Sequence, residues 1–370
     1  MLLRRIIRVI LGILTALCGL SLLLSAWAGT VDPRTLPVSA VVAMTAPICI
    51  AVTAIVLVLD LIWCRRGAIF AAACLLTAAP SVMSNFPVHP FAGKLTEEQK
   101  KRSWTLLSYN VYNFLPANGY YPDSINQTME YIIRADADVV ALQEAESFGC
   151  GMAYCIRPWQ IDSLKRRYRH IIQNGKGMCL LSKYPVTPLR SSFASRGMGQ
   201  GDCAAYAIDI DGHRVALFSV HLQSIGLTGE DKTMFRELTD IRGDGEPRPS
   251  LGDVRRQLVT KLAEAAVKRA DHADMLIRDI ARYGGENVIV CGDFNDVPGC
   301  WALHRLSDCG MREVYPEVGT GYMRTYNKNR FWFRIDHILY RGRLKPVSMH
   351  RGSIVSSDHF PVMATFVFDE

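Results

Sequence analysis

Three long stretches without a charged residue occupy most of the start of the chain, at Val9–Thr30, Leu36–Leu59 and Gly67–Val88. Each has 22 to 24 residues, and a helix needs about 20 apolar residues to cross the hydrocarbon core of a bilayer. Three such stretches in succession, separated by few polar residues, are not typical of helices buried in a soluble protein. The pattern predicts a membrane anchor over residues 1–90 with three transmembrane helices, so that residues 6–88 contact the lipid bilayer.

Arginines are unevenly placed around these stretches. Three precede the first stretch and two lie between the second and the third, at positions 4, 5, 8, 65 and 66. Because positively charged loops stay in the cytoplasm, we expect both arginine-rich ends there and the chain after residue 89 on the other side. A cleaved signal peptide is the alternative for the first stretch, since Ala26-Trp27-Ala28 resembles a cleavage site. We favour a multi-pass integral membrane protein, and both interpretations place the rest of the chain outside the cytoplasm.

The charge of the remaining chain is nearly balanced. The 370 residues carry a net charge of +7, of which the first 93 carry +4 from six arginines and two aspartates. A large domain with a net charge of only +3 is not typical of proteins that bind nucleic acid through phosphate-backbone attraction alone. A hydrophobic share of 49% also excludes an intrinsically disordered chain.

The composition changes again after the apolar stretches. Residues 91–102 contain Gly93 and a charged run, which predicts a linker before a catalytic domain over residues 103–370. In that domain, helical spacing is found over residues 123–134 and 255–281. Strands are expected at Thr105–Tyr109, Ala137–Leu142, His170–Gln173, Met178–Ser182, Ala204–Ile210, Val215–His221, Asn287–Cys291, Phe333–Tyr340 and Val362–Phe368.

Eight polar residues lie at, or just past, the ends of these expected strands: Asn110, Glu144, His221, Asp293, Asn295, Asp336, Asp358 and His359. Strand ends at one edge of a sheet can meet in a single pocket although they are far apart in sequence. Mg²⁺ prefers oxygen ligands and keeps several waters, so one or two carboxylates suffice to bind it. Histidines can transfer protons near neutral pH. The set therefore indicates a metal-dependent phosphoester site.

Each of these residues also has a simpler explanation when it is taken alone. Gly292–Asp296 has the composition of a turn, and Ser357–His359 could be a polar loop. His221 by itself is more typical of a satisfied core histidine, and Asp336 could be a charge at a strand edge. The order in which all of them occur along the chain favours the functional interpretation.

Seven motifs carry these residues: Ser108-Tyr109-Asn110, Asp138–Glu144, Leu181–Pro185, Ser219–Leu222, Gly292–Asn295, Arg334–Ile338 and Ser357–Val362. In this order they resemble the endonuclease/exonuclease/phosphatase superfamily, over Ser103 to Phe368. The resemblance implies an α+β fold, a four-layer α/β/β/α sandwich of two facing β-sheets, here preceded by the three transmembrane helices. The motifs are specific for the superfamily and not for a substrate.

The resemblance also implies which residues bind a metal ion. Glu144 matches the principal metal-binding glutamate, and Asn110 and Asp358 match residues on the metal side of the site. Mg²⁺ is the expected ion and Mn²⁺ the alternative, while the number of ions stays open. A zinc site is not indicated, because these ligands are oxygens and the sequence has no Cys-x-x-Cys.

Five further residues match catalytic positions of the superfamily. His359 matches the histidine that activates water or steadies the phosphoryl group, and Asp336 matches its carboxylate partner. Asp293 and Asn295 match residues that orient the nucleophile and bind a phosphoryl oxygen. His221 matches the second histidine of the deoxyribonuclease and sphingomyelinase-like branches, which apurinic endonucleases lack.

The function expected from these features is a membrane-anchored phosphoesterase. It would hydrolyse a phosphodiester or phosphomonoester by in-line attack of water, with a lipid-linked phosphate as one possible substrate. An extracytoplasmic nuclease acting on DNA or RNA is the first alternative, and a catalytically inactive binding module is the second. The oligomeric state is not indicated.

Several other residues are weaker candidates. Arg324, Tyr326 and Arg334 are expected substrate contacts near the last motifs. The polar loop 224–252 either selects the substrate or is an inert excursion, and Arg255, Arg256 and Lys261 beyond it are more typical of a solvated helix face. Two cysteine pairs, Cys150–Cys155 and Cys300–Cys309, are close enough in sequence to form disulfides in an oxidising compartment.

Overall fold

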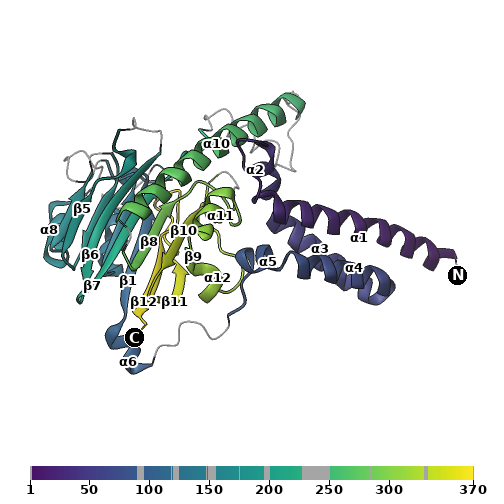
Figure 1. Cartoon of the computed structure of the whole chain (residues 1–370), viewed down its shortest axis with the longest axis horizontal. Coiled ribbons are helices and arrows are strands. Elements are labelled where there is room, and N and C mark those ends of the chain that lie inside the picture. Colours follow the sequence, from purple (N-terminus) through teal and green to yellow (C-terminus); the bar gives the residue numbers. More distant parts are fainter. Residues whose placement is uncertain are drawn as a thin grey trace.

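The computed structural model describes residues 2–89, 96–117, 119, 125–146, 148, 156–174, 176–195, 201–226, 251–283, 285–328 and 332–369. Five helices at the start of the chain precede a body that contains all the described strands (Figure 1). The helices α1, α3 and α4 extend away from this body, while α2 and α5 lie next to it. The expected Cys150–Cys155 pair and most of the loop 224–252 lie outside the described residues, as do the side chains of Arg255 and Arg256.

The described strands form two six-stranded sheets. In spatial order, the first contains β11 (Leu344–Arg351), β12 (Val362–Phe368), β1 (Trp104–Asn110), β2 (Val139–Gln143), β4 (Cys179–Ser182) and β3 (His170–Gln173). The second contains β5 (Val186–Leu189), β6 (Asp202–Ile210), β7 (His213–His221), β8 (Asn287–Asp293), β10 (Asp336–Arg341) and β9 (Arg312–Glu313). Only the central pairs β1–β2 and β7–β8 are parallel among the described strand pairs.

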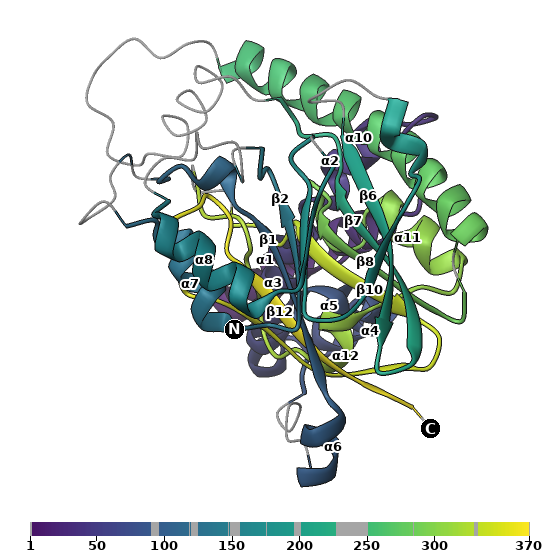
Figure 2. The same cartoon turned by 90° about the vertical axis from the view of Figure 1, so that its left-hand side faces the viewer.

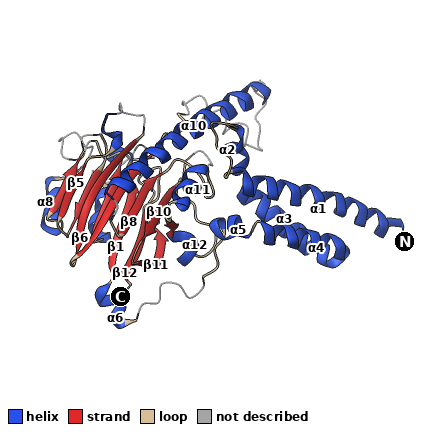
Figure 3. Cartoon of the chain, in the orientation of Figure 1, coloured by secondary structure: helices blue, strands red, loops and turns tan. Residues whose placement is uncertain are grey.

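The two sheets face each other, with helices on the outer faces (Figure 3). Alternate residues of a strand point to opposite faces of its sheet, and the core follows this rule. Leu106 of β1 packs between the sheets with Leu217 of β7, whereas Leu107 packs in the outer cluster with Met129. The helices α7 (Gln127–Ala135) and α8 (Pro158–Arg167) cover the first sheet, and α10 (Leu251–Tyr283) and α11 (Trp301–Asp308) cover the second (Figure 2). The expected four-layer α/β/β/α sandwich is confirmed.

The strand directions bring six strand ends to one edge of the sandwich. The parallel pairs place Asn110 opposite Gln143, and His221 opposite Asp293, so that β1, β2, β7 and β8 end together. The antiparallel neighbour β10 begins at this edge, with Asp336 opposite Asp293. β12 also runs antiparallel to β1, and His359 lies just before its start. The topology therefore gathers the motif residues at one edge.

The N-terminal helices are α1 (Leu2–Ala28), α2 (Val38–Ala43), α3 (Ala46–Trp63), α4 (Arg65–Thr77) and α5 (Ala79–Asn85). In the described part of the chain, α1 and α3 are long and apolar enough to cross a membrane. The third expected span is a pair, α4 and α5, bent by 71°. Pro80 lies near the start of α5, and a proline removes a backbone donor and clashes with the preceding turn. The structure thus has two candidate spans, or three if the bent pair is one span.

The N-terminal helices are fixed to the sandwich through the segment that follows α1. Arg34 donates hydrogen bonds from Nη1 to Asp274 at 2.7 Å and to Asp271 at 3.3 Å, and both aspartates belong to α10. Gly29 packs directly on the backbone of Gly299, where a Cβ atom would lie 1.7 Å from the carbonyl oxygen. Only a glycine allows so close an approach. The helices and the sandwich are therefore in direct contact.

Some elements differ from the sequence-based expectations. The edge strands β5, β9 and β11 and the helices α8 and α11 were not expected, and the strand expected from Phe333 begins only at Asp336. Cys300 and Cys309 are free. They flank the two ends of α11, about 13 Å apart at 1.5 Å per residue, and a disulfide needs Cα atoms less than about 7 Å apart. The expected Cys300–Cys309 bridge is therefore wrong.

Candidate active site

Asp293, at the end of β8, is the centre of the polar cluster at this edge. Its side chain is 1% exposed. Its Oδ2 atom accepts a hydrogen bond from Asn110 Nδ2 at 3.0 Å and lies 3.5 Å from His359 Nε2. His221 Nε2 lies 3.7 Å from the same oxygen and 3.6 Å from Glu144 Oε1. Two carboxylates, one amide and two imidazoles thus meet within hydrogen-bonding or ion-pair range.

Two residues of the site, Glu144 and Asn295, have uncommon backbone conformations. Glu144 and Asn295 both have φ of 51°, a left-handed conformation that costs a residue with a Cβ atom about 1 kcal/mol or more. The Asn113 N–H donates to the carbonyl oxygen of Glu144 at 2.7 Å. The Asn295 N–H donates to Asp293 Oδ1 at 2.8 Å, and Asn295 Nδ2 donates to the Leu222 carbonyl at 3.0 Å. These bonds fix the turns that follow β2 and β8.

His359 and Asp336 form a buried pair next to Asp293. His359 Nδ1 donates to Asp336 Oδ2 at 2.9 Å, which directs Nε2 toward Asp293. Burial by itself lowers the pKa of His359, but the nearby carboxylates, Asp336 and Asp293 above all, hold this pKa well above its usual value. The carboxylates thus favour the positively charged form of the ring. The second oxygen of Asp336 has no hydrogen-bond partner among the described residues.

The carboxylates of the cluster repel one another. Burial raises the pKa of Asp358, and the charges of Glu144 and Asp293 raise it further against the opposing effect of His359. In the described part of the chain, two overlapping groups have ligand atoms within 4.8 Å of one another: Glu144, His221 and Asp293, and Asp293, Asp336 and His359. Several buried or partly buried carboxylates at one place fit a divalent cation, since its charge would relieve this repulsion.

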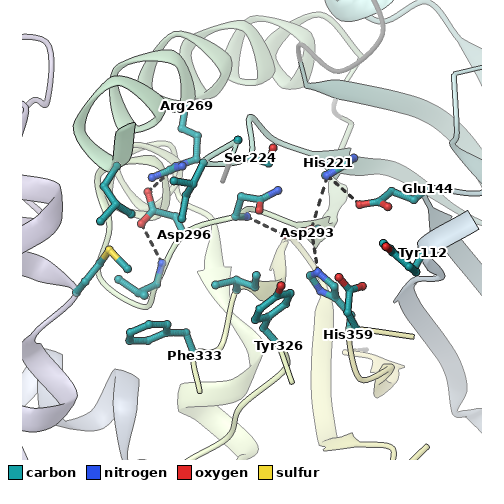
Figure 4. A pocket seen from close by; sticks show the side chains of 18 residues that line it. Tyr112, Glu144, His221, Ser224, Arg269, Asp293, Asp296, Tyr326, Phe333 and His359 are labelled. Carbon is teal, nitrogen blue, oxygen red and sulfur yellow. Dashed lines mark hydrogen bonds and ion pairs between the residues drawn. The ribbon is translucent and has the colours of Figure 1, made fainter. Parts of the chain in front are cut away.

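The cluster borders a cavity of about 250 Å³ (Figure 4). The expected site residues that line it are Glu144, His221, Asp293, Asn295, Tyr326, Asp358 and His359. Tyr326 packs edge-on against the ring of His359, with 5.2 Å between ring centroids. Asp336 lies behind His359, away from the cavity.

Asn110 also lies beneath the cavity surface. It is fully buried, and its Nδ2 donates to Glu144 Oε1 at 2.8 Å as well as to Asp293. Its Oδ1 accepts the Tyr112 N–H at 3.1 Å. In this arrangement the expected metal ligand Asn110 positions two carboxylates through its amide nitrogen instead of presenting an oxygen to the cavity.

Two of the expected substrate contacts lie elsewhere. Arg324 is exposed, and its guanidinium packs 5.9 Å from the ring centroid of Phe360. Arg334 is 2% exposed and forms an ion pair with Glu313. Arg334 Nη2 donates to the carbonyl of Ser84 in α5 at 2.7 Å. We therefore correct Arg334 from a substrate contact to a buried link between the sandwich and the N-terminal helices.

The cavity has further lining residues that the sequence reasoning missed. Arg269 of α10 donates from Nε to Asp296 Oδ2 at 2.9 Å, and both residues are buried. Arg269 follows Leu262 and Ala266 on the apolar stripe of the helix, and a charge on such a stripe is a signal for a buried partner. Tyr112 lies two residues after Asn110. Met44, from the N-terminal segment, has no sequence signal that connects it to the site.

Solved structures with similar folds have low sequence identity to this chain. Truncated TDP2 of Caenorhabditis elegans is 18% identical, with 73% of this chain and 99% of that chain covered and a TM-score of 0.45. The human nocturnin catalytic domain with bound sulfate is 14% identical, with 72% and 95% covered and a TM-score of 0.46. The endonuclease/exonuclease/phosphatase from Bacteroides vulgatus is 15% identical, with 72% and 99% covered and a TM-score of 0.44.

Models of protein families match two segments of the chain. No curated protein matches the chain. A model described as "Domain of unknown function (DUF8431)" matches residues 6–85, the region of the N-terminal helices. A model described as "Endonuclease/Exonuclease/phosphatase family" matches residues 107–359, which is more than half of the chain and spans every motif residue of the cluster. The chain therefore belongs to the endonuclease/exonuclease/phosphatase family and is a hydrolase of phosphate ester bonds.

Proposed function

We propose that the chain is a membrane-anchored, divalent-metal-dependent phosphoesterase. Residues 1–90 form the anchor, residues 91–102 the linker and residues 103–370 the catalytic domain. One observation carries the proposal: Asp293 Oδ2 is shared by Asn110, His221 and His359 at the border of a cavity that Glu144 and Asp358 also line. This is an arrangement for binding a cation and a phosphate ester together.

The metal would be held by carboxylate oxygens. Glu144 and Asp358 border the cavity, and Asp293 lies between them and the histidines. Mg²⁺ is the ion that we propose, with Mn²⁺ as a substitute, because both accept oxygen ligands and retain waters. When bound, it would neutralise negative charge on the phosphate and polarise the ester.

The residues of the chain supply positioning and proton transfer. The carboxylates around His359 favour its charged form, in which Nε2–H can donate to a phosphoryl oxygen and stabilise charge that grows during the reaction. Asp293 Oδ2 can accept a hydrogen bond from the attacking water, orient it, and take its proton as the bond to phosphorus forms. The water oxygen bonds to phosphorus as the ester oxygen leaves in line. His221, half-buried beside Glu144, is placed to give a proton to the leaving alcohol.

The surface of the N-terminal helices supports insertion in a membrane. Large apolar side chains are exposed along α1 and α3, among them Leu17, Leu24, Ile55 and Ile62. A continuous apolar surface of this kind is typical of contact with lipid. We propose that residues 6–88 anchor the chain in the bilayer as two or three spans.

The positions of the arginines support an extracytoplasmic catalytic domain. Arg8 Nε donates to the carbonyl of Trp63 at 3.1 Å, so the N-terminal arginines and the turn at Arg65 share one end of the helices. The sandwich is attached at the opposite end (Figure 1). By the positive-inside rule, the arginine-rich end is cytoplasmic. Protease added outside intact cells should then cleave the domain, whereas protection until lysis would contradict this topology.

The experiment that tests the activity uses the full chain in detergent. Methyl p-nitrophenyl phosphate, phosphoinositides, sphingomyelin and plasmid DNA are offered with Mg²⁺ or with EDTA. We expect hydrolysis with Mg²⁺, loss of hydrolysis with EDTA, and recovery when Mn²⁺ is added. His359→Gln should lose most turnover, while His350→Gln, an exposed histidine on β11, serves as the matched control.

The panel also separates the competing functions. Because the anchor holds the site near a bilayer, we propose a lipid-linked phosphate as the substrate class. Nicked plasmid with intact lipids would favour an extracytoplasmic nuclease. Turnover that persists in EDTA would contradict the metal dependence. No turnover of any substrate would favour an inactive binding module.

A further inference from the structure

The cavity at the active site has two chemically different ends. Glu144 and Tyr112 lie at one end, whereas Arg269, Asp296 and Phe333 lie toward the other (Figure 4). The purple ribbon of the N-terminal segment borders the cavity on the side of Phe333 and not on the side of Glu144. The apolar side chains that line the cavity include Met44, Leu262, Val297, Phe333 and Ile335. The cavity is thus an acidic site continued by an apolar region.

Met44 comes from outside the catalytic domain. It lies between α2 and α3, directly after the last residue of α2. The small residues Ser39 and Ala40 of α2 line a narrow crevice together with Ala266 and Ala270 of α10, so the two helices pack closely. The Arg34 ion pairs and the Gly29 contact hold the same segment on the sandwich. Met44 is therefore a fixed wall of the cavity and not a chance neighbour.

The charged residues of this region compensate each other. Arg269 is bonded to Asp296 and also donates from Nη1 to the carbonyl of Gln223 at 3.2 Å. Asp296 Oδ1 accepts the Val297 N–H at 2.9 Å. A second anionic group of a substrate would have to compete with Asp296 for Arg269. An uncharged, apolar group meets no such competition in this part of the cavity.

We infer that the apolar end of the cavity binds the hydrocarbon part of a lipid-linked phosphate ester, and that Met44 is a specificity residue. The inference rests on the proposed function, since it takes the acidic end as the place of the phosphate. The segment that carries Met44 connects two candidate spans. It therefore lies at the membrane surface that faces the sandwich, near the hydrocarbon chains of membrane lipids.

The test compares phosphodiesters that differ only in chain length. Methyl, butyl and octyl p-nitrophenyl phosphates are hydrolysed by the full chain in nanodiscs, with thymidine 5′-(p-nitrophenyl phosphate) as a nucleotide-like substrate. For the unmodified protein, kcat/KM should rise with alkyl length, by up to about fourfold for each buried methylene. Met44→Gln should lower kcat/KM for the octyl ester by about tenfold. It should leave kcat/KM for the methyl ester nearly unchanged. Met44→Leu should behave like the unmodified protein.

The control variant is Met83→Gln, an exposed methionine on α5, which should change neither value. Equal losses of Met44→Gln on methyl and octyl esters, or the absence of any chain-length effect, would overturn the inference and leave the proposed function intact. A preference for the thymidine ester over the octyl ester would overturn it in favour of a nucleotide. If no ester is hydrolysed, the proposed function fails. The inference about Met44 is then tested by calorimetric measurement of octylphosphonate binding. Binding about tenfold weaker to Met44→Gln would still support the inference, and equal binding would refute it.

Discussion

Replacing Asp336 by Asn tests the contact on which the proposed chemistry of His359 depends. The two residues are joined by a 2.9 Å hydrogen bond, and both are almost fully buried. A hydrogen bond to a charged group contributes about 1.5–3 kcal/mol, and about 1.4 kcal/mol corresponds to a factor of ten in rate. Asp336→Asn keeps the shape of the side chain and removes its charge. We therefore expect kcat/KM to fall by about 10- to 100-fold.

The same substitution should change the pH dependence in a defined direction. The pKa of His359 is raised by the carboxylates around it, so the charged, donating form persists well above the usual range of a histidine. Activity that needs this form is present below that pKa and is lost as the pH rises through it. Without the charge of Asp336 the pKa of His359 falls, and the loss of activity should begin at a lower pH than in the unmodified protein.

The assay is the pH profile of kcat/KM for methyl p-nitrophenyl phosphate with Mg²⁺ in excess. Asp209→Asn, an exposed aspartate on β6, is the matched control and should retain the original profile. Thermal unfolding shows whether Asp336→Asn is folded at the assay temperature. A folded variant whose alkaline limb stays in place, or moves to higher pH, would refute the assignment of His359 as a charged donor.

Three further predictions concern stability. Gly292→Ala should destabilise the fold by on the order of 2 kcal/mol or more, because the new Cβ atom would lie 2.0 Å from the Val220 carbonyl oxygen. An unchanged midpoint of denaturant unfolding would contradict the close approach of β8 to its neighbouring strand β7. Burial alone raises the pKa of Glu313, but Arg334 and His337 lower it to about 2. A carboxyl group whose pKa is lowered in the folded state stabilises the fold above about pH 4.5. The free energy of unfolding of the unmodified protein should therefore exceed that of Glu313→Gln by on the order of 3 kcal/mol above this pH, and the difference should disappear between pH 4.5 and 2. A difference that stays constant in urea titrations over that range would contradict this. Arg34→Ala should weaken the attachment of α2 to α10 and speed proteolysis of the segment after Ala28, whereas Arg4→Ala should leave the rate of proteolysis unchanged. Equal rates for the two variants would show that the ion pairs of Arg34 with α10 contribute little to this attachment.

The polar half of the site could be predicted from the sequence because each of its residues terminates or precedes a strand. Asn110 ends β1 and Glu144 follows its parallel neighbour β2, while His221 ends β7 and Asp293 ends its parallel neighbour β8. The ends of a parallel pair must lie at the same edge of its sheet. The apolar alternation of the central strands predicts the two buried sheets for the same reason. Short edge strands such as β5 and β9 carry weaker patterns, since they pack on fewer neighbours.

Other features depend on tertiary contacts that no local pattern records. The break at Pro80 could have been noticed in the sequence, but the 71° angle between α4 and α5 belongs to the three-dimensional packing, in which α5 contacts α12 as well as α3 and α4. Arg334 matches a motif, and its burial against Glu313 and Ser84 follows only from the docking of α5. Free Cys300 and Cys309 show that sequence proximity predicts a disulfide poorly when a helix separates the two thiols.

The two halves of the cavity differ in where their residues come from. The acidic half is built from motif residues inside the segment matched by the family model, residues 107–359. Met44 lies outside that segment, and Leu262 and Phe333 lie within it but between its motifs. Family membership therefore constrains the bond that is hydrolysed and leaves the substrate open. On our proposal the substrate is selected where the N-terminal segment meets α10, so exchanging residues 29–45 should alter substrate preference without altering the chemistry of His359 and Asp293.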